Sequence, residues 1–237
     1  MERQGAGRQP SLQNRVPGPA SAAAAPAPLR ACLLSGGASR RMGRDKALLP
    51  HAEGGTWLEH TLGLLGQLEL PITLFSRHEA HRQLAQAWAE SSGAPAPLQA
   101  IAEPPPWQGP LLALHRLLQL HPNERLLLCP VDMPGLNADT LATLLTAAAA
   151  QPTTIHLADD GTRLQPLLAV LPATPALRAD LAAAVAGGER RLQHWLTQQP
   201  HRAVPLDPAA LHNCNRPEEI PGATATEQAP APAPERA

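Results

Sequence analysis

Short apolar runs alternate with helical patterns through most of this 237-residue chain, and this alternation restricts the fold more than any other feature. The segments 30–35, 71–76, 98–101 and 125–129 have the length and apolar composition of buried strands. The intervening segment 56–68 places apolar side chains three and four residues apart, as on one face of a helix. Strands that alternate with helices predict a three-layer α/β/α sandwich with a mostly parallel, Rossmann-like sheet.

The second half of the chain continues this pattern, with one exception to strict alternation. Helical patterns cover 137–150 and 175–188, and the strand-like segments 153–158 and 164–171 are separated only by the turn sequence DDGTR. We therefore expect one folded domain over residues 29–220. The Pro- and Ala-rich segments 1–28 and 221–237 cannot bury enough apolar surface to offset chain entropy, so a disordered leader and a disordered tail are predicted.

The charge balance limits the possible partners. Lys and Arg residues (19) nearly balance Asp and Glu residues (20), which leaves a formal net charge of -1 at pH 7. Such a chain has no overall attraction to nucleic acid or to anionic membranes, so any anion site must be local. No apolar stretch approaches the roughly 20 residues that a membrane-spanning helix needs. We expect a cytoplasmic protein that binds neither nucleic acid nor membrane.

Neither the cysteines nor the histidines follow a disulfide or zinc pattern. Cys32, Cys129 and Cys214 are widely spaced and odd in number, which favours reduced core residues in a reducing compartment. His78 and His81 lie three residues apart on a predicted helix, and we interpret them as surface residues rather than as a zinc pair.

The segment after the first predicted strand combines adjacent glycines with several cations. Gly36 and Gly37 are followed within ten residues by Arg40, Arg41, Arg44 and Lys46. Adjacent glycines allow backbone N-H groups to turn toward an anion, and the cations add charge that backbone dipoles alone do not supply. Ligands of open α/β sheets bind outside the carboxyl ends of the strands. This segment is interpreted as a polyphosphate-binding loop, although its spacing differs from the common G-x-x-x-x-G-K-[ST] and G-x-G-x-x-G motifs.

Two later segments carry polar side chains that could face the same cleft. Asp132 follows the strand 125–129 between two prolines, and opposite a phosphate loop its carboxylate is a natural ligand for Mg²⁺. Asn213 and Asn215 are two residues apart, so an extended backbone would point both amides the same way. Asn215 has an alternative role as the cap of a helix that begins at Pro217.

Taken together, these motifs resemble the molybdenum cofactor guanylyltransferase family of the nucleotidyltransferase superfamily. The matching stretches are L-x-G-G-x-S-x-R-M-G-x-D-K at 34–46, P-x-D-x-P at 130–134, QPL at 165–167, AGGERR at 186–191 and N-x-N-x-P-E-E at 213–219. The resemblance spans nearly all of residues 29–220. It implies a nucleotidyltransferase fold, GTP and Mg²⁺ as reactants, transfer of GMP to molybdopterin (molybdenum cofactor) and release of pyrophosphate. It also implies contacts with proteins that deliver the cofactor and with molybdoenzyme chaperones.

The resemblance further implies roles for individual residues. The catalytic group would be Arg41, Lys46 and Asp132, with Asp132 on the metal. The nucleotide would contact the ends of the strands and the loop, at Leu34, Ser35, Gly36, Gly37, Lys46, Ser76, Glu103 and Asp132. The acceptor would lie against Arg190, Arg191, Asn213 and Asn215.

Three other functions stay open from the sequence. Ser76 and Glu103 stand where the family usually has asparagine and aspartate, so the choice between GTP and CTP is not fixed. A cytidylyltransferase or a sugar-phosphate nucleotidyltransferase would share the loop and the metal. A non-catalytic nucleotide-binding module would hold the ligand without turning it over. A dinucleotide-dependent oxidoreductase is disfavoured by the glycine spacing.

Overall fold

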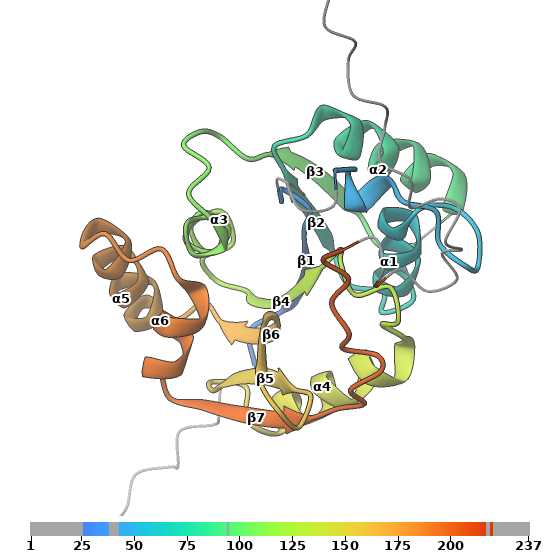
Figure 1. The fold of residues 1–237 in the computed structure, drawn as a ribbon. Helices are drawn as coiled ribbons and strands as arrows, with labels where there is room; N and C mark the ends of the chain where they lie inside the picture. The colour runs from blue at the N-terminus through green and yellow to red at the C-terminus, as the bar shows by residue number, and fades with distance from the viewer. Residues whose placement is uncertain (1–25, 38–42, 94, 217–218, 220–237) are drawn as a thin grey trace, which may run out of the picture.

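A seven-stranded sheet forms the centre of the protein, in the order β3-β2-β1-β4-β6-β5-β7 (Figure 1). This computed structural model describes residues 26–37, 43–93, 95–216 and 219. The strands are β1 (Leu29–Leu34), β2 (Ile72–Ser76), β3 (Leu98–Ala102), β4 (Arg125–Pro130), β5 (Ile155–Asp159), β6 (Leu164–Pro172) and β7 (His201–Pro205). β6 runs antiparallel to β4 and β5, whereas the other neighbouring pairs are parallel. The expected mostly parallel sheet is confirmed.

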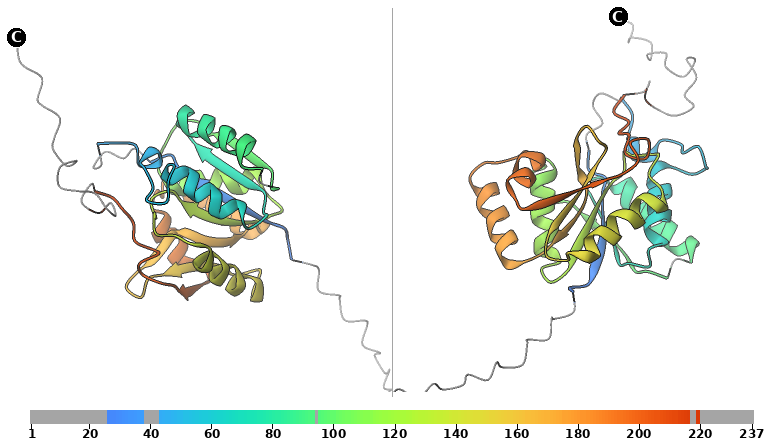
Figure 2. Two further views of the ribbon diagram at one scale, coloured as in Figure 1. Left: turned by 90° about the vertical axis from the view of Figure 1, so that its right-hand side faces the viewer. Right: turned by 90° about the horizontal axis from the view of Figure 1, so that it is seen from below.

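Helices cover both faces of this sheet, which gives the three layers expected (Figures 1 and 2). The helical elements are the 3-10 turn η1 (Lys46–Leu48), α1 (Trp57–Gly66), α2 (Glu79–Ser92), α3 (Pro110–Leu120), α4 (Ala138–Ala150), α5 (Pro175–Ala186) and α6 (Leu192–Gln198). α1, α2 and α4 pack on one face, and α3, α5 and α6 pack on the other.

Two apolar cores lie on the two faces of the sheet because successive strand side chains point in opposite directions. In β4, Leu127 packs with Leu58 and Leu62 of α1, while the adjacent Leu128 packs with Leu114 of α3 and Trp195 of α6. All six side chains are at most 1% exposed. Burial of each leucine contributes about 1.5–3 kcal/mol, so the continuous apolar runs fix which strands are central.

Local signals in the sequence set the helix starts. Thr56 forms a capping box with Glu59 before α1, and the Asn137 side chain accepts a hydrogen bond from the Thr140 N-H at the start of α4. Pro110 occupies the first turn of α3, where its missing N-H costs nothing. These residues anchor the helices that lead away from the strand ends.

Helix α6 and strand β7 are absent from the sequence-based prediction. α6 is seven residues long and buries Leu192, Trp195 and Leu196 at helical spacing. β7 pairs in parallel with β5 at the edge of the sheet, and Val204 is its one buried residue. A short edge strand with a terminal proline carries little apolar signal, because its free edge needs neither burial nor a full set of N-H donors.

All three cysteines are free and buried, as expected. Burial raises the pKa of Cys129 to about 12 and that of Cys214 to about 11, and it raises the pKa of Cys32 further. The thiols therefore stay protonated and unreactive in the folded protein.

Several predictions from the sequence lie outside the described residues. They include most of the leader, the whole tail 221–237, the segment 38–42 with Arg40 and Arg41, and the proposed helix start at Pro217. Within the residues that are described, no helix is both long enough and apolar enough to cross a membrane.

Candidate active site

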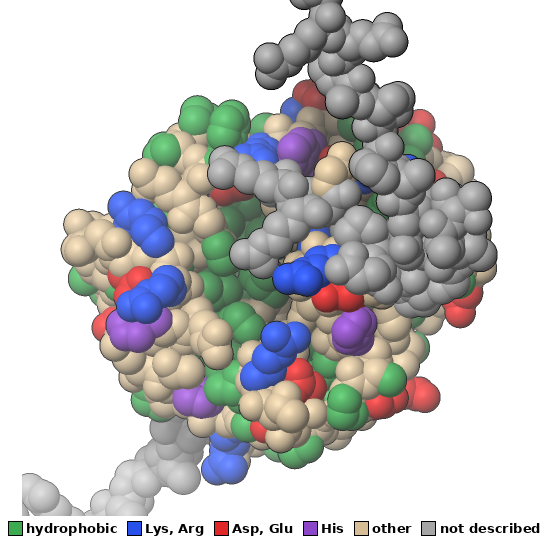
Figure 3. Space-filling view, viewed as in Figure 1, with side chains coloured by type: hydrophobic (Ala, Val, Ile, Leu, Met, Phe, Trp, Pro, Cys, Tyr) green, Lys and Arg blue, Asp and Glu red, His purple; other side chains and the backbone are tan. Residues whose placement is uncertain are grey.

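A cavity of about 600 Å³ opens where β1 and β4 end, with the start of α3 along one side. Figure 3 shows the hollowed face, with hydrophobic side chains in the hollow and Lys and Arg side chains around it. The cavity is lined by the residues that follow β1, by Asp132 after β4, and by Lys46 and Asn215 from distant segments. Its size is typical of a small-molecule site, and it lies at the carboxyl ends of the strands, where open α/β sheets bind their ligands.

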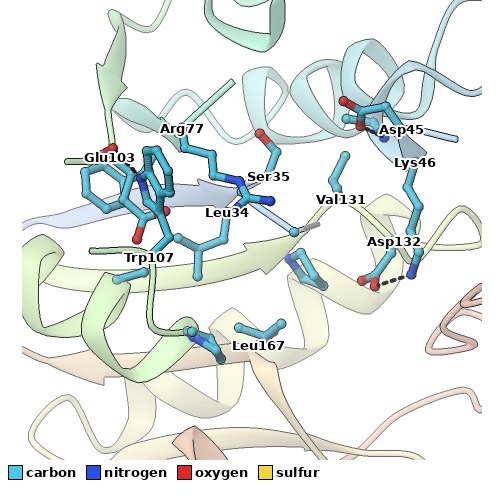
Figure 4. Close-up of a pocket in the computed structure, with 18 of the residues that line it drawn as sticks. Leu34, Ser35, Asp45, Lys46, Arg77, Glu103, Trp107, Val131, Asp132 and Leu167 are labelled. Carbon is cyan, nitrogen blue, oxygen red and sulfur yellow. Dashed lines mark hydrogen bonds and ion pairs between the residues drawn. The ribbon is translucent and has the colours of Figure 1, made fainter. Parts of the chain in front are cut away.

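The cationic and acidic residues expected to converge do meet in this cavity. The Lys46 Nζ lies 3.2 Å from the Asp132 Oδ2 and donates a hydrogen bond of 2.7 Å to the Asn215 Oδ1 (Figure 4). The backbone N-H of Cys214 donates to the Asp132 carbonyl at 3.0 Å, which fixes the C-terminal segment beside the loop after β4. Three distant parts of the sequence are thereby assembled into one charged cluster.

The same cluster offers hard oxygen donors. The Asp132 carboxylate is 23% exposed and lines the cavity, and the Asn215 amide oxygen contacts the same Lys46 ammonium group. A carboxylate and an amide oxygen beside solvent are suitable ligands for a hard divalent cation, which completes its shell with water and phosphate oxygens. The residues present therefore fit a divalent metal.

Of the two glycines after β1, only Gly36 occupies a place too close to a neighbouring side chain for a Cβ atom. Neither Gly36 nor Gly37 has a positive φ. A Cβ atom on Gly36 would lie 2.9 Å from the Glu103 Oε2, whereas a Cβ on Gly37 would meet nothing within 4 Å. Gly36 thus allows the Glu103 carboxylate to approach the loop, and Gly37 leaves the cavity open.

Glu103 lines the cavity in a partly desolvated setting. Its Oε1 accepts a hydrogen bond of 3.2 Å from Arg116, and its carbonyl accepts one of 2.9 Å from the Trp107 indole N-H. Burial raises the pKa of Glu103, and the Arg116 and Arg77 guanidinium groups act against that rise. Arg77 lies over the Trp107 ring, 5.4 Å from its centroid. Glu103 and Trp107 lie at the end of the cavity opposite Lys46 and Asp132 in Figure 4.

Ser76 lies in the interior rather than on the cavity wall. It is fully buried, and its hydroxyl donates a hydrogen bond of 3.2 Å to the Ser35 carbonyl. The next residue, Arg77, lines the cavity instead. The expectation of a surface position for His81 is wrong, because this side chain is 1% exposed and bonds to Asp45, whereas His78 is half-buried.

Of the four residues expected near the acceptor, the structure places one on the cavity wall and three outside it. Asn215 lines the cavity, but the Asn213 side chain donates to the Gln165 Oε1 at 2.8 Å and is not among the lining residues. Arg190 and Arg191 do not line it either. The Arg190 guanidinium donates to the carbonyls of Val185 and Glu189, and Arg191 is exposed.

Glu189 organises the turn that carries these two arginines. Its carboxylate accepts hydrogen bonds from the backbone N-H groups of Arg191 and Arg190 and from His194, and these bonds lower its pKa to about 2. The arginines therefore stand on a rigid turn beside the cavity, where the Arg190 carbonyl lies 3.7 Å from the Cβ position of Gly109.

One group of potential metal ligands lies elsewhere, at His51, Glu53 and His60. The two imidazole rings are stacked, with centroids 3.6 Å apart and an interplanar angle of 16°. Imidazole lone pairs lie in the ring plane, so two nearly parallel rings do not aim at one ion. The Nδ1 of His51 also accepts the Glu53 N-H. The two histidines instead contact the backbone that follows Asp132, since His51 and His60 lie within hydrogen-bond distance of the carbonyls of Pro134 and Leu136.

Several lining residues were missed by the sequence-based prediction. Arg77 and Trp107 follow the ends of strands, where the search for polar groups could have found them. The Asp45 side chain caps η1, where it accepts from the Ala47 N-H.

Comparison with known proteins gives consistent matches over most of the chain. Residues 31–203 match the family described as the MobA-like NTP transferase domain. The chain is 36% identical over 203 residues to a probable molybdenum cofactor guanylyltransferase of Rhodopirellula baltica. This match covers 83% of this chain and 92% of that protein. The chain is also 31% identical over 202 residues to a molybdenum cofactor guanylyltransferase of Ectopseudomonas mendocina, with the same coverage of 83% and 92%.

A solved structure shares the fold. The molybdopterin-guanine dinucleotide biosynthesis protein A of Archaeoglobus fulgidus matches with a TM-score of 0.57 and 18% identity, over 80% of this chain and 94% of that chain.

Proposed function

Because the chain belongs to the family of MobA-like NTP transferase domains, as its relatives the molybdenum cofactor guanylyltransferases indicate, we propose that it transfers GMP from GTP to molybdopterin and releases pyrophosphate. One observation carries this proposal. The Lys46 ammonium and the Asp132 carboxylate lie 3.2 Å apart on a cavity that is large enough for a nucleotide.

The shape of the cavity supports one orientation of the nucleotide. The triphosphate would lie along Gly36 and Gly37 toward Lys46, and the base would lie toward Glu103 and Trp107 (Figure 4). The Watson–Crick edge of guanine presents two adjacent N-H donors, which match the two oxygens of a carboxylate. Cytosine lacks this pair of donors, so Glu103 favours GTP.

Asp132 would hold Mg²⁺, with the Asn215 amide oxygen beside it. When bound, Mg²⁺ would neutralise charge on the phosphate oxygens. Lys46 would contact the same oxygens from the loop, and its contacts with Asp132 and Asn215 hold its ammonium group in place.

The reaction joins two anions. An oxygen of the acceptor phosphate forms a bond to the α-phosphorus of GTP, and the bond from that phosphorus to the bridging oxygen breaks as pyrophosphate leaves. The acceptor phosphate is already ionised near neutral pH, so alignment and charge stabilisation matter more than proton removal. Lys46 would stabilise the charge that develops on pyrophosphate. Arg41 is proposed for the same role.

The acceptor is proposed to enter on the side of the cavity that Asn215 lines. Asn213 would act through Gln165, which it contacts directly. Arg190 and Arg191 stand on the turn held by Glu189, so an anionic acceptor or the protein that delivers it would meet them at the rim.

The test is to incubate the purified protein with Mg²⁺, molybdopterin and each nucleoside triphosphate in turn. We expect pyrophosphate release with GTP and a product whose mass is that of the guanine dinucleotide. Turnover with CTP in its place would identify a cytidylyltransferase, and turnover only with a sugar phosphate acceptor would identify that class. Nucleotide binding with no pyrophosphate under any condition would contradict an enzymatic role.

A further inference from the structure

A buried hydrogen-bond chain connects the ends of β1 and β2 to the loop that carries Lys46. Its centre is His81 on α2, which is 1% exposed. The His81 Nε2 lies 2.8 Å from the Asp45 Oδ2. On the other edge of the ring, the Nδ1 lies 3.0 Å from the Ser35 Oγ and 3.1 Å from the Ser76 Oγ.

One arrangement of protons satisfies every member of this chain. The Asp45 carboxylate only accepts, so the His81 Nε2 carries a proton and donates it. The Ser76 hydroxyl donates to the Ser35 carbonyl, and its oxygen accepts the His78 N-H at 3.1 Å. The Nδ1 then accepts the proton of the Ser35 hydroxyl. The orientation of the ring is therefore fixed from both edges.

Asp45 passes this constraint to Lys46. While its Oδ2 binds His81, its Oδ1 accepts the Ala47 N-H at 3.1 Å and caps the 3-10 turn that begins at Lys46. The Asp45 carbonyl also accepts the Leu48 N-H at 3.2 Å. Both carboxylate oxygens are thus used, one on the rigid sheet side and one on the turn.

We propose that His81 is a positioning residue that holds the Lys46 turn in register with the phosphate end of the cavity through Asp45. This rests on the proposed function in one respect, namely that Lys46 meets the phosphates of the nucleotide. Asp132 and Asn215 hold the ammonium group at its far end, and His81 holds the backbone from which the side chain starts. A displacement of about 1 Å at a reacting site can cost roughly 10²-fold in rate.

The order Asp45–His81–Ser35 has the contacts of a nucleophilic triad, but its setting favours positioning. Ser35 is 2% exposed, and its hydroxyl points at the ring from the end of a strand. The proposed transfer also needs no protein nucleophile, because the acceptor phosphate is itself the attacking group. His81 therefore has no proton to move in this reaction.

The test compares two replacements that keep different halves of the ring. The amide nitrogen of His81→Gln can occupy the place of Nε2 and still reach Asp45, whereas that of His81→Asn occupies the place of Nδ1 and cannot. With His81→Asn we expect kcat/KM for GTP to fall tenfold to about 10²-fold, and Mg²⁺-GTP affinity to fall as well. With His81→Gln both values should stay within about threefold of the parent.

A double-mutant cycle with Lys46→Ala separates positioning from loss of folding. If His81 acts through Lys46, His81→Asn should add less than about twofold in the Lys46→Ala background. Equal losses in both His81 variants, or full additivity with Lys46→Ala, would overturn the proposal. Labelling of Ser35 by a fluorophosphonate would also overturn it, since it would mark an activated nucleophile.

Two further measurements keep the test decisive. If His81→Asn does not fold, Asp45→Ser replaces it, because serine still caps the turn but is too short to reach His81. The affinity for Mg²⁺-GTP is measured by calorimetry without acceptor, so the contrast between the two His81 variants remains visible even if the protein proves not to be a guanylyltransferase.

Discussion

Replacement of Asp132 by asparagine should separate the chemical role of this side chain from its contribution to folding. The change keeps the size of the side chain and one oxygen, and it removes the charge. In the parent protein the Asp132 Oδ2 faces the Lys46 Nζ at 3.2 Å, and the two side chains are 23% and 12% exposed. Lys46 also contacts Asn215 at 2.7 Å in the parent protein, and we expect this contact to persist in the variant.

The two effects differ greatly in size. An ion pair that borders solvent contributes about 1 kcal/mol or less to the free energy of unfolding. In a domain of roughly 150–250 residues this corresponds to a decrease of about 2–4 °C in the melting temperature. Loss of a preorganised charge at the reacting phosphates costs about 10²–10³ in kcat. We therefore expect Asp132→Asn to melt almost normally and to turn over at least about 10² times more slowly.

The assay combines thermal melting of the ligand-free protein with pyrophosphate release over a series of Mg²⁺ concentrations. Asp139→Asn is the matched control, because Asp139 is an exposed carboxylate in the first turn of α4 and outside the cavity. Near-normal turnover of Asp132→Asn across the series would refute its assignment to the metal. A melting temperature lower by more than about 10 °C would instead show that the pair is needed for folding.

Three other predictions follow from the same structure. Lys46→Ala should lower kcat/KM for GTP by about 10²–10³ in the pyrophosphate assay, and Lys46→Arg should recover part of it. The thiols should resist a disulfide reagent at pH 8 until the protein is unfolded. The folded pKa values of Cys129 and Cys214, about 12 and about 11, exceed the unfolded value of 9, so their contribution to the free energy of unfolding is fully present below pH 9 and is lost as the pH rises toward 12. Urea unfolding should therefore show a lower free energy of unfolding at pH 10.5 than at pH 8. Gly135→Ala should destabilise the fold by about 1–3 kcal/mol in urea unfolding, because its Cβ would lie 2.8 Å from the Ala209 carbonyl oxygen, whereas an unchanged midpoint would show that this backbone contact is loose.

The alternation of apolar runs and helical patterns was sufficient to predict six of the seven strands and the mostly parallel sheet that they form. Strands such as β1 and β4 are buried on both faces, so nearly every residue in them is apolar, and the pattern is strong in the sequence. The convergence of Lys46 and Asp132 was predictable for a related reason. Both follow strands that end at the same edge of a parallel sheet, and β1 and β4 are direct neighbours.

Other parts of the candidate site were not predictable in this way. In sequence, His81 cannot be distinguished from an exposed histidine on an amphipathic helix. Only the orientation in which α2 packs on the sheet buries it against Asp45. Asn213 and Asn215 lie in the same segment, but the Asn213 side chain hydrogen-bonds to Gln165, whereas the Asn215 side chain hydrogen-bonds to Lys46. The positions of the strand ends do not reveal which hydrogen-bond partner each polar side chain will have.

Local periodicity thus determined most helices and strands of this protein and the edge of the sheet at which its chemistry is expected, because strand and helix repeats are properties of neighbouring residues. The partners of each buried polar group were decided only by the tertiary structure. A hydrogen bond depends on distances of about 3 Å between atoms that the chain separates by tens of residues, and only packing of the two cores fixes such distances.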